Sequence, residues 1–161
     1  MRHLRARRQG IGTPVRFVNH KSLLRGILLP ATAIIPLCLG EARADGALAI
    51  GLPSNVATQG FASGYSHDRK NMDEARKDAL ISCRLAPTAA GTRALCSVIE
   101  TFTHKCVAVA MDPTDGSPGV GWSVAETKLT AESEALARCA ATAGDGRREA
   151  CNISHSGCDG F

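Results

Sequence analysis

Small apolar residues recur at helical spacing in two places along the chain. In the first, the apolar positions follow one another at intervals of three or four residues and are Met72, Ala75, Ala79 and Cys83. This spacing puts them on one stripe of a helix. The pattern Ala79-Leu80-x-x-Cys83 within it returns as Ala135-Leu136-x-x-Cys139. Because the stripe is narrow and its side chains are small, we expect each helix to pack closely against a sheet.

The residues around these stripes predict where both helices begin and end. Asn71 and Glu74 resemble a capping box, in which two side chains satisfy free backbone donors at the helix start. Pro87 ends the first helix. In the second copy, Thr127 or Thr130 caps a helix that runs to about Ala143.

Short apolar runs bounded by glycine, proline and polar residues predict strands. They lie at 47–50, 60–66, 95–102, 106–111, 120–125 and 151–154. The connection at 103–105 is tight and predicts a hairpin between the two strands beside it. The turn-rich segment at 112–119 predicts a linker between two repeats.

These elements form two related units. Gly64-Tyr65-Ser66 precedes the first helix and Gly121-Trp122-Ser123 precedes the second. Two cysteines follow each helix cysteine at related but shortened spacings, as in duplicated units whose loops have changed length. The predicted order is β-β-α-β-β followed by β-α-β-(β). The predicted fold class is α+β: a small disulfide-stapled domain of two pseudo-repeats, about 60–111 and 119–159, each a helix packed on short antiparallel strands.

Residues 1–44 have the three parts of a secretory signal peptide. A basic run without acids precedes an apolar segment at 26–40, and Ala42-Arg43-Ala44 offers the small residues that a signal peptidase needs. The apolar segment is shorter than the roughly 20 residues of a spanning helix. We expect cleavage after Ala44 and one disulfide-bonded domain at 45–161, periplasmic or secreted, without a membrane span. The basic leader is unusually long, which leaves the true translation start open.

The net charge changes sign once the leader is set aside. The whole chain carries a formal charge of +4. Residues 45–161 hold eleven Lys and Arg against fourteen Asp and Glu, a net charge of −3. The positive balance therefore belongs to the leader. We expect no nucleic-acid partner, which would need a basic patch on the folded domain.

The cysteine count points to disulfides. Six cysteines remain after the leader, an even number that suits three bridges in a small exported domain. They are Cys83, Cys96, Cys106, Cys139, Cys151 and Cys158. Large side chains are few in this part of the chain, and alanine supplies much of the apolar content. Because such a core buries little area, the roughly 2–4 kcal/mol that a disulfide adds is expected to decide folding.

The order of motifs resembles a known family. An A-L-x-x-C helix, a second cysteine about a dozen residues later, Phe102-x-x-x-Cys106-x-Ala108-x-Ala110 and a Gly-Trp-Ser unit with a second A-L-x-x-C follow one another. This order is similar to the exported bacterial domains catalogued as domain of unknown function 4189, over about residues 47–158. The resemblance implies export and a compact disulfide-bonded fold. It implies no reaction, cofactor or catalytic residue.

Six cysteines allow fifteen pairings, and the sequence alone does not choose among them. If the two units are pseudo-symmetric, Cys83–Cys96 and Cys139–Cys151 would each join a helix end to the following strand. Cys106–Cys158 would then link equivalent last positions across the repeats. A link between Cys83 and Cys106 would contradict this scheme.

The histidines are the obvious candidates for acid–base chemistry. His67, His104 and His155 need a nucleophile or substrate and a group that orients the ring. Their neighbours in the sequence do not supply that set, and oxidised cysteines offer no thiolate. We therefore expect no catalytic residue.

Two spacings could suit a metal ion. Cys151-x-x-x-His155-x-x-Cys158 has zinc-like ligands, but repeat-matched cysteines in an oxidising compartment favour disulfides. Asp112-x-x-Asp115-Gly116 lacks the fuller ligand set of a calcium loop and fits a turn better. We expect no metal and no cofactor.

Tyr65 and Trp122 occupy equivalent places in the two units. Exposed together with His67, they would form a binding surface, because aromatic residues dominate interface hot spots. We favour the alternative, that they fill a core with few other large residues. The leading hypothesis is a non-enzymatic exported domain that binds another envelope or exported protein, its oligomeric state open. The alternatives are a small periplasmic hydrolase and a purely structural envelope protein.

Overall fold

The computed structural model describes residues 44–160. All described residues belong to one compact unit of the chain. Residues 1–43 of the expected leader lie outside the described residues, so the signal peptide stays a prediction. Within 44–160, no helix has both the length and the apolar character needed to cross a membrane.

Six strands form two antiparallel sheets. In chain order they are β1 (Asp45–Gly51), β2 (Ala62–Arg69), β3 (Ser97–Phe102), β4 (Cys106–Met111), β5 (Val120–Ala125) and β6 (Asn152–Cys158). One sheet has the order β2-β1-β3 and the other β5-β4-β6. In both sheets, the first strand of the unit is central and the strands that follow it flank it. The predicted α+β class with two related units is confirmed.

Two long helices alternate with short ones. They are α1 (Val56–Gln59), α2 (Met72–Arg84), α3 (Ala90–Ala94) and α4 (Lys128–Thr142), and a short 3-10 helix spans Arg148–Ala150. The predicted caps are present: the Asn71 side chain accepts from the Glu74 amide at 2.9 Å, and Thr127 accepts from the Thr130 amide at 3.2 Å. The short helices α1 and α3 lie between predicted elements, at positions where the sequence pattern predicted no helix.

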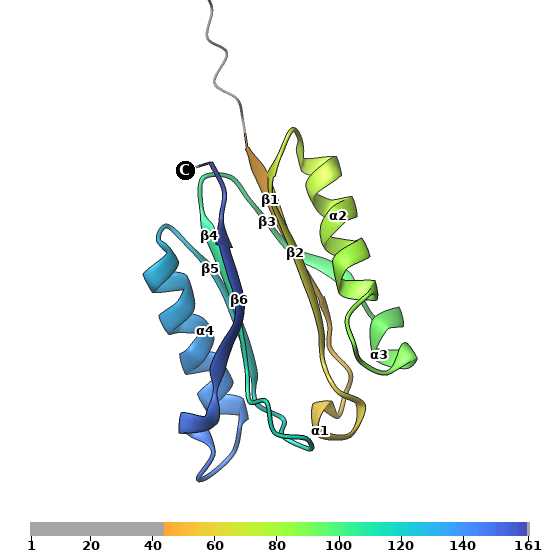
Figure 1. The fold of residues 1–161 in the computed structure, drawn as a ribbon, viewed down its shortest axis with the longest axis vertical. Coiled ribbons are helices and arrows are strands. Elements are labelled where there is room, and N and C mark those ends of the chain that lie inside the picture. The colour runs from red at the N-terminus through yellow and green to blue at the C-terminus, as the bar shows by residue number, and fades with distance from the viewer. Residues whose placement is uncertain (1–43, 161) are drawn as a thin grey trace, which may run out of the picture. The chain divides into compact units, whose positions relative to one another are not determined.

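The described part of the chain is arranged in four layers. Figure 1 shows the two sheets face to face, with α2 on the outer face of one and α4 on the outer face of the other. Each helix packs on its own sheet through a cluster of small residues. A third cluster fills the space between the sheets.

The predicted hairpin at 103–105 is wrong. β3 pairs with β1 and β4 pairs with β5 and β6, so the tight connection passes from one sheet to the other. His104 in this connection has a left-handed φ of 54°, and its amide donates to the Asp159 carboxylate at 3.3 Å. This carboxylate comes from the far end of the chain, so the local sequence did not reveal it.

The units therefore differ from the expected bounds. Each is β-β-α-β, at about 45–102 and 106–158. The strand at 106–111 opens the second unit instead of closing the first. The turn at 112–119 connects β4 to β5 inside one sheet, where Asp112 donates its amide to the Gly119 carbonyl at 2.9 Å. β6 runs as one strand from Asn152 to Cys158, so Cys158 ends this strand and does not begin the bracketed further strand that the sequence predicted.

Both helices touch their sheets through the same residues. The fully buried positions of α2 are Ala75, Ala79 and Cys83, and those of α4 are Ala131, Ala135 and Cys139. A Cβ on Gly64 of β2 would meet the backbone of Ala79 and Cys83, and a Cβ on Gly121 of β5 would meet that of Ala135 and Cys139. The Gly-aromatic-Ser pattern thus marks the strand position that each helix crosses most closely.

Three disulfides join these elements, and the pairing expected from pseudo-symmetry is confirmed. Cys83 is bonded to Cys96, and Cys139 to Cys151, each with Cα atoms 6.0 Å apart. Each of these bonds joins a helix to the segment that enters the last strand of its unit. Cys106 and Cys158 are register partners on β4 and β6 and are bonded to each other. This third bond closes the second sheet rather than linking the two units.

The larger apolar side chains gather between the sheets. Leu48, Ile50, Phe102, Val107 and Val109 are buried there, with Phe61, Tyr65, Trp122 and Val124 packed around them. The outer layers bury only alanine and cysteine, with leucine, isoleucine and valine at their margins. The inter-sheet layer therefore holds all four Phe, Tyr and Trp residues of the described chain, and three of them, Phe61, Tyr65 and Trp122, line the cavities described below.

We expect Gly64→Ala to lower the free energy of unfolding by about 3 kcal/mol, near the upper end of typical overpacking costs. The added methyl would press on the α2 backbone, which has no flexible side chain that could move away. Urea denaturation would measure the change. The matched control is Gly91→Ala in α3, where no atom lies within 4 Å of the new Cβ. This control should be neutral or slightly stabilising, because alanine favours a helix. Equal stability of the two variants would contradict the close helix–sheet contact.

Candidate functional site

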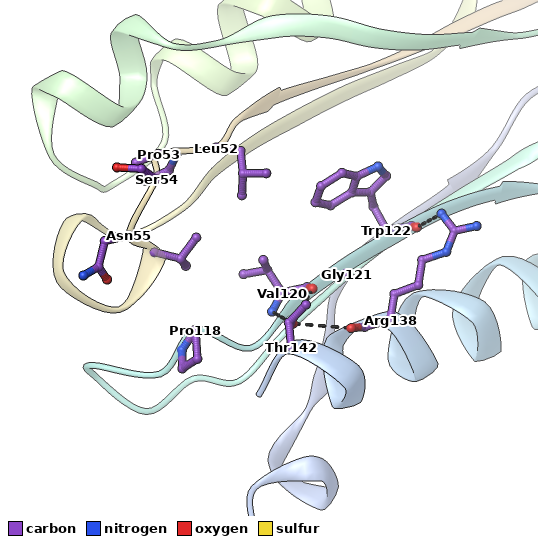
Figure 2. Close-up of a pocket in the computed structure, with 11 residues that line it drawn as sticks. Leu52, Pro53, Ser54, Asn55, Pro118, Val120, Gly121, Trp122, Arg138 and Thr142 are labelled. Carbon is purple, nitrogen blue, oxygen red and sulfur yellow. Dashed lines mark hydrogen bonds between the residues drawn. The ribbon is translucent and has the colours of Figure 1, made fainter. Parts of the chain in front are cut away.

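An apolar pocket opens between the loop that follows β1, residues 52–55, and the layer formed by β5 and α4. It has a volume of about 490 Å³ and is lined mainly by Leu52, Pro53, Val56, Pro118, Val120 and Trp122. We call it the Trp122 pocket. In Figure 2, Leu52 and Trp122 lie on facing sides of the opening, one from each unit. The Phe61 ring stacks on the Trp122 indole with ring centres 6.1 Å apart, which fixes this wall of the pocket.

A single cationic side chain lies at the rim of this pocket. Arg138 of α4 donates from Nη1 to the Trp122 carbonyl at 2.6 Å. Its other terminal nitrogen, Nη2, lies 3.7 Å from the Glu134 carboxylate, and the side chain is 58% exposed. Thr142, also on the rim, donates to the Val120 carbonyl at 2.8 Å and accepts from the Val120 amide at 2.9 Å. The pocket therefore combines apolar walls with a positioned guanidinium.

A row of polar and aromatic side chains lies between β2 and β6. Ser63, Tyr65 and His67 alternate along β2 and so share one face. The Tyr65 ring stacks on His155 of β6 with centres 5.0 Å apart, and on His67 with centres 5.8 Å apart. Gly157 makes this possible, since a Cβ there would meet both the Tyr65 and His67 rings.

His155 lies between two serines in the wall of a second cavity. This His155 cavity has a volume of about 560 Å³ and is lined by Phe61, Ser63, Tyr65, Leu85, Met111, His155 and their neighbours. Ser63 Oγ is 3.4 Å from His155 Nε2, and Ser154 Oγ is 3.1 Å from Nδ1. Burial lowers the pKa of His155 below its usual 6.5, so the ring is neutral at pH 7.

The structure separates the two aromatics that the sequence paired. Tyr65 and Trp122 both pack against the inter-sheet core, but Tyr65 stacks on histidines and Trp122 stacks on Phe61. Each is half-buried and lines a cavity of its own. His67 lies beside Tyr65, and its Nδ1 is 2.9 Å from the Asp68 carboxylate. These residues therefore fill the core and form cavity walls at the same time.

Sequence reasoning missed several residues of this region. Ser63 carries no motif, and it meets His155 across 92 positions of sequence. Asp159 is fully buried and accepts from the Asp68 amide at 2.7 Å. The Gly160 amide in turn donates to Asp68, which lowers the pKa of that carboxyl. The end of the described chain is thereby fastened to the end of β2.

The residues at the two metal-like spacings make other bonds in the structure. Cys151 and Cys158 are bonded to different cysteines, so they cannot ligate zinc as thiolates. Asp112 holds Arg147 through two hydrogen bonds of 2.7 Å and accepts from the Ser117 hydroxyl at 2.7 Å. These contacts tie the β4–β5 turn to the segment after α4. Among residues 44–160, no group of three or more His, Cys, Asp or Glu is placed to hold a metal ion.

The fold and its bridges define a small disulfide-stapled α+β domain built from two pseudo-repeats. The chain belongs to the family described as a domain of unknown function (DUF4189), whose model matches residues 46–158. The match covers both structural units. Searches of curated proteins and of solved structures found no match.

The Asp112–Arg147 contact predicts a pH dependence of stability. The Ser117 hydroxyl, the Thr114 amide and Arg147 hold the pKa of Asp112 well below its usual range, against the opposing effect of burial. A carboxyl with a lowered folded-state pKa stabilises the fold above its unfolded pKa, near 3.9, and loses that contribution as the pH falls towards the folded value.

We therefore expect Asp112→Asn to be less stable than the natural protein at pH 7, with the difference shrinking as the pH falls from about 5 to about 2. Urea midpoints at a series of pH values would measure the difference in stability between the two proteins. The other acidic groups titrate in both proteins, so their contributions cancel in this difference. A difference that does not change over this range would contradict the assigned role of Asp112.

Proposed function

We propose that the chain is an exported binding domain of the bacterial envelope or periplasm, and that the Trp122 pocket takes an apolar side chain of another exported or envelope protein. The observation that carries the proposal is the pocket itself. Apolar walls from both units meet around a half-buried tryptophan. Small pockets that hold an aromatic anchor are typical hot spots of protein interfaces.

The pocket is suited to a partner that offers an apolar group beside a carboxylate. Leu52 is 48% exposed at the opening, although a leucine normally gains about 1.5–3 kcal/mol from burial. Arg138 presents a guanidinium at the rim, and guanidinium groups pair well with carboxylates. Covering Leu52 and neutralising a partner carboxylate would both favour the complex.

The scaffold supports a rigid, pre-formed site. Three disulfides and the close helix–sheet contacts hold the walls of the pocket in place, which reduces the entropy lost on binding. Three disulfides also fit an oxidising compartment. Together with the sequence of residues 1–44, they favour a periplasmic or secreted domain from which the leader is removed after Ala44.

The test uses the oxidised protein to capture partners from a periplasmic or envelope extract of the source bacterium. We expect Leu52→Ser to weaken the capture of a specific partner about tenfold, because an apolar contact worth roughly 1.4 kcal/mol is lost. Arg138→Glu should weaken it further by reversing the charge at the rim. The matched control is Leu129→Ser on α4, because Leu129 is 79% exposed and does not line the pocket.

The emission of Trp122 reports directly on the pocket. Trp122 is the only tryptophan of the chain, so intrinsic fluorescence has a single source. Addition of the purified partner should shift this emission in the natural protein and in Leu129→Ser, and much less in Leu52→Ser. A partner that binds all variants equally and leaves the emission unchanged would contradict the proposed pocket.

A further inference from the structure

A hydroxyl and a neutral imidazole from different units meet inside the His155 cavity. Ser63 on β2 and His155 on β6 lie 92 residues apart in the sequence, yet Ser63 Oγ is 3.4 Å from His155 Nε2. A nucleophile and its base need this kind of proximity, and the distance is often longer in the absence of substrate than the 2.6–3.2 Å of a working pair. The contact is separate from the Trp122 pocket, which neither residue lines.

The other ring nitrogen of His155 also has a hydroxyl partner, which can accept a hydrogen bond from the tautomer that a base towards Ser63 needs. Ser154 Oγ lies 3.1 Å from Nδ1. With the proton on Nδ1, the ring donates to Ser154 and leaves Nε2 free to accept from the Ser63 hydroxyl. This is the arrangement in which a histidine acts as a general base towards a serine, with Ser154 as a positioning residue.

The ring is also held in its plane. Tyr65 stacks on His155 at an interplanar angle of 7°, and the Tyr65 hydroxyl donates to the Ser156 carbonyl at 3.5 Å. His67 covers the Tyr65 ring as well. The stack restricts rotation of the imidazole, so Nε2 keeps facing Ser63. Burial keeps the ring neutral at pH 7 by lowering its pKa, and a neutral ring can accept a proton.

The cavity around the pair would accept an apolar group. Phe61, Leu85 and Met111 form an apolar part of the cavity wall. The Leu85 side chain is 77% exposed. Ser63 and His155 are both only partly buried, so a substrate carbonyl can reach them. The cavity volume of about 560 Å³ is within the range of small-molecule sites.

We propose that Ser63 and His155 form a nucleophile–base pair that hydrolyses carboxylic esters with an apolar acyl group bound in the His155 cavity. Ser63 Oγ attacks the ester carbonyl carbon while its proton moves to His155 Nε2. The carbon–oxygen bond to the alcohol then breaks, and the proton on Nε2 passes to the leaving alkoxide. Water attacks the resulting acyl-serine, gives a proton to Nε2 and releases the carboxylic acid, and that proton returns to Ser63 Oγ.

The test treats the oxidised protein with an alkyl fluorophosphonate, which phosphonylates an activated serine and releases fluoride. Intact mass and peptide mapping should find one label, on Ser63. Ser63→Ala should remove the label and the hydrolysis of p-nitrophenyl butyrate. His155→Gln should slow both by about 100-fold or more, the usual contribution of a general base. The matched control is Ser133→Ala. Ser133 on α4 donates to the Thr130 carbonyl at 3.0 Å and lines neither cavity, so this variant should label on Ser63 at the natural rate.

Folding is checked for every variant through its three disulfides and its Trp122 emission. If His155→Gln does not fold, Ser154→Ala replaces it and should lower kcat more than it changes KM, because the Ser154 hydroxyl lies 3.1 Å from His155 Nδ1. The proposal is overturned if the folded natural protein carries no label on Ser63, or if Ser63 labels equally fast in a folded His155→Gln variant. Either result would leave the proposal about the Trp122 pocket standing, because the experiments on the two sites change no residue in common.

Discussion

The backbone of α2 lies so close to Gly64, and that of α4 so close to Gly121, that a Cβ at either glycine would overlap the helix. This distance is possible because the inner faces of the helices are alanine and cysteine. Contacts between such small residues bury little apolar area, so each outer layer depends on a disulfide that fastens its helix to the next strand. The duplicated A-L-x-x-C motif supplies the small residue and the cysteine that this arrangement needs in each helix.

The thin outer layers determine where larger side chains can go. Aromatic and branched residues are placed between the sheets, where both units contribute to one cluster. Side chains at the margins of this cluster remain partly exposed and line cavities: Trp122 faces the loop that follows β1, and Tyr65 holds His155 beside Ser63. Both proposed activities therefore arise where the two units meet. The helices themselves act as scaffold.

The local pattern of the sequence was enough to predict the α+β class and both long helices with their caps. The cysteine pairing followed only from the assumption that the two repeats are pseudo-symmetric. These features depend on residues close together in the chain or on the repeat. The role of β4 was predicted incorrectly, because a three-residue connection can close a hairpin or cross between sheets, and the buried Asp159 carboxylate that holds His104 comes from the far end of the chain. The candidate site was harder to predict from the sequence than the strand order. His155 was a candidate, but its partner Ser63 has no motif and becomes its neighbour only when the sheets pack face to face.

The packing of the two sheets is the central claim, and the stack of Tyr65 on His155 tests it most directly. Tyr65 is the only tyrosine of the chain, so its ring protons give one assignable set of NMR signals. With ring centres 5.0 Å apart, nuclear Overhauser effects between the Tyr65 ring and the His155 ring protons are expected in the oxidised protein. Strong effects between these rings would support the face-to-face arrangement. Their absence, in a protein whose three disulfides are formed as described, would contradict it.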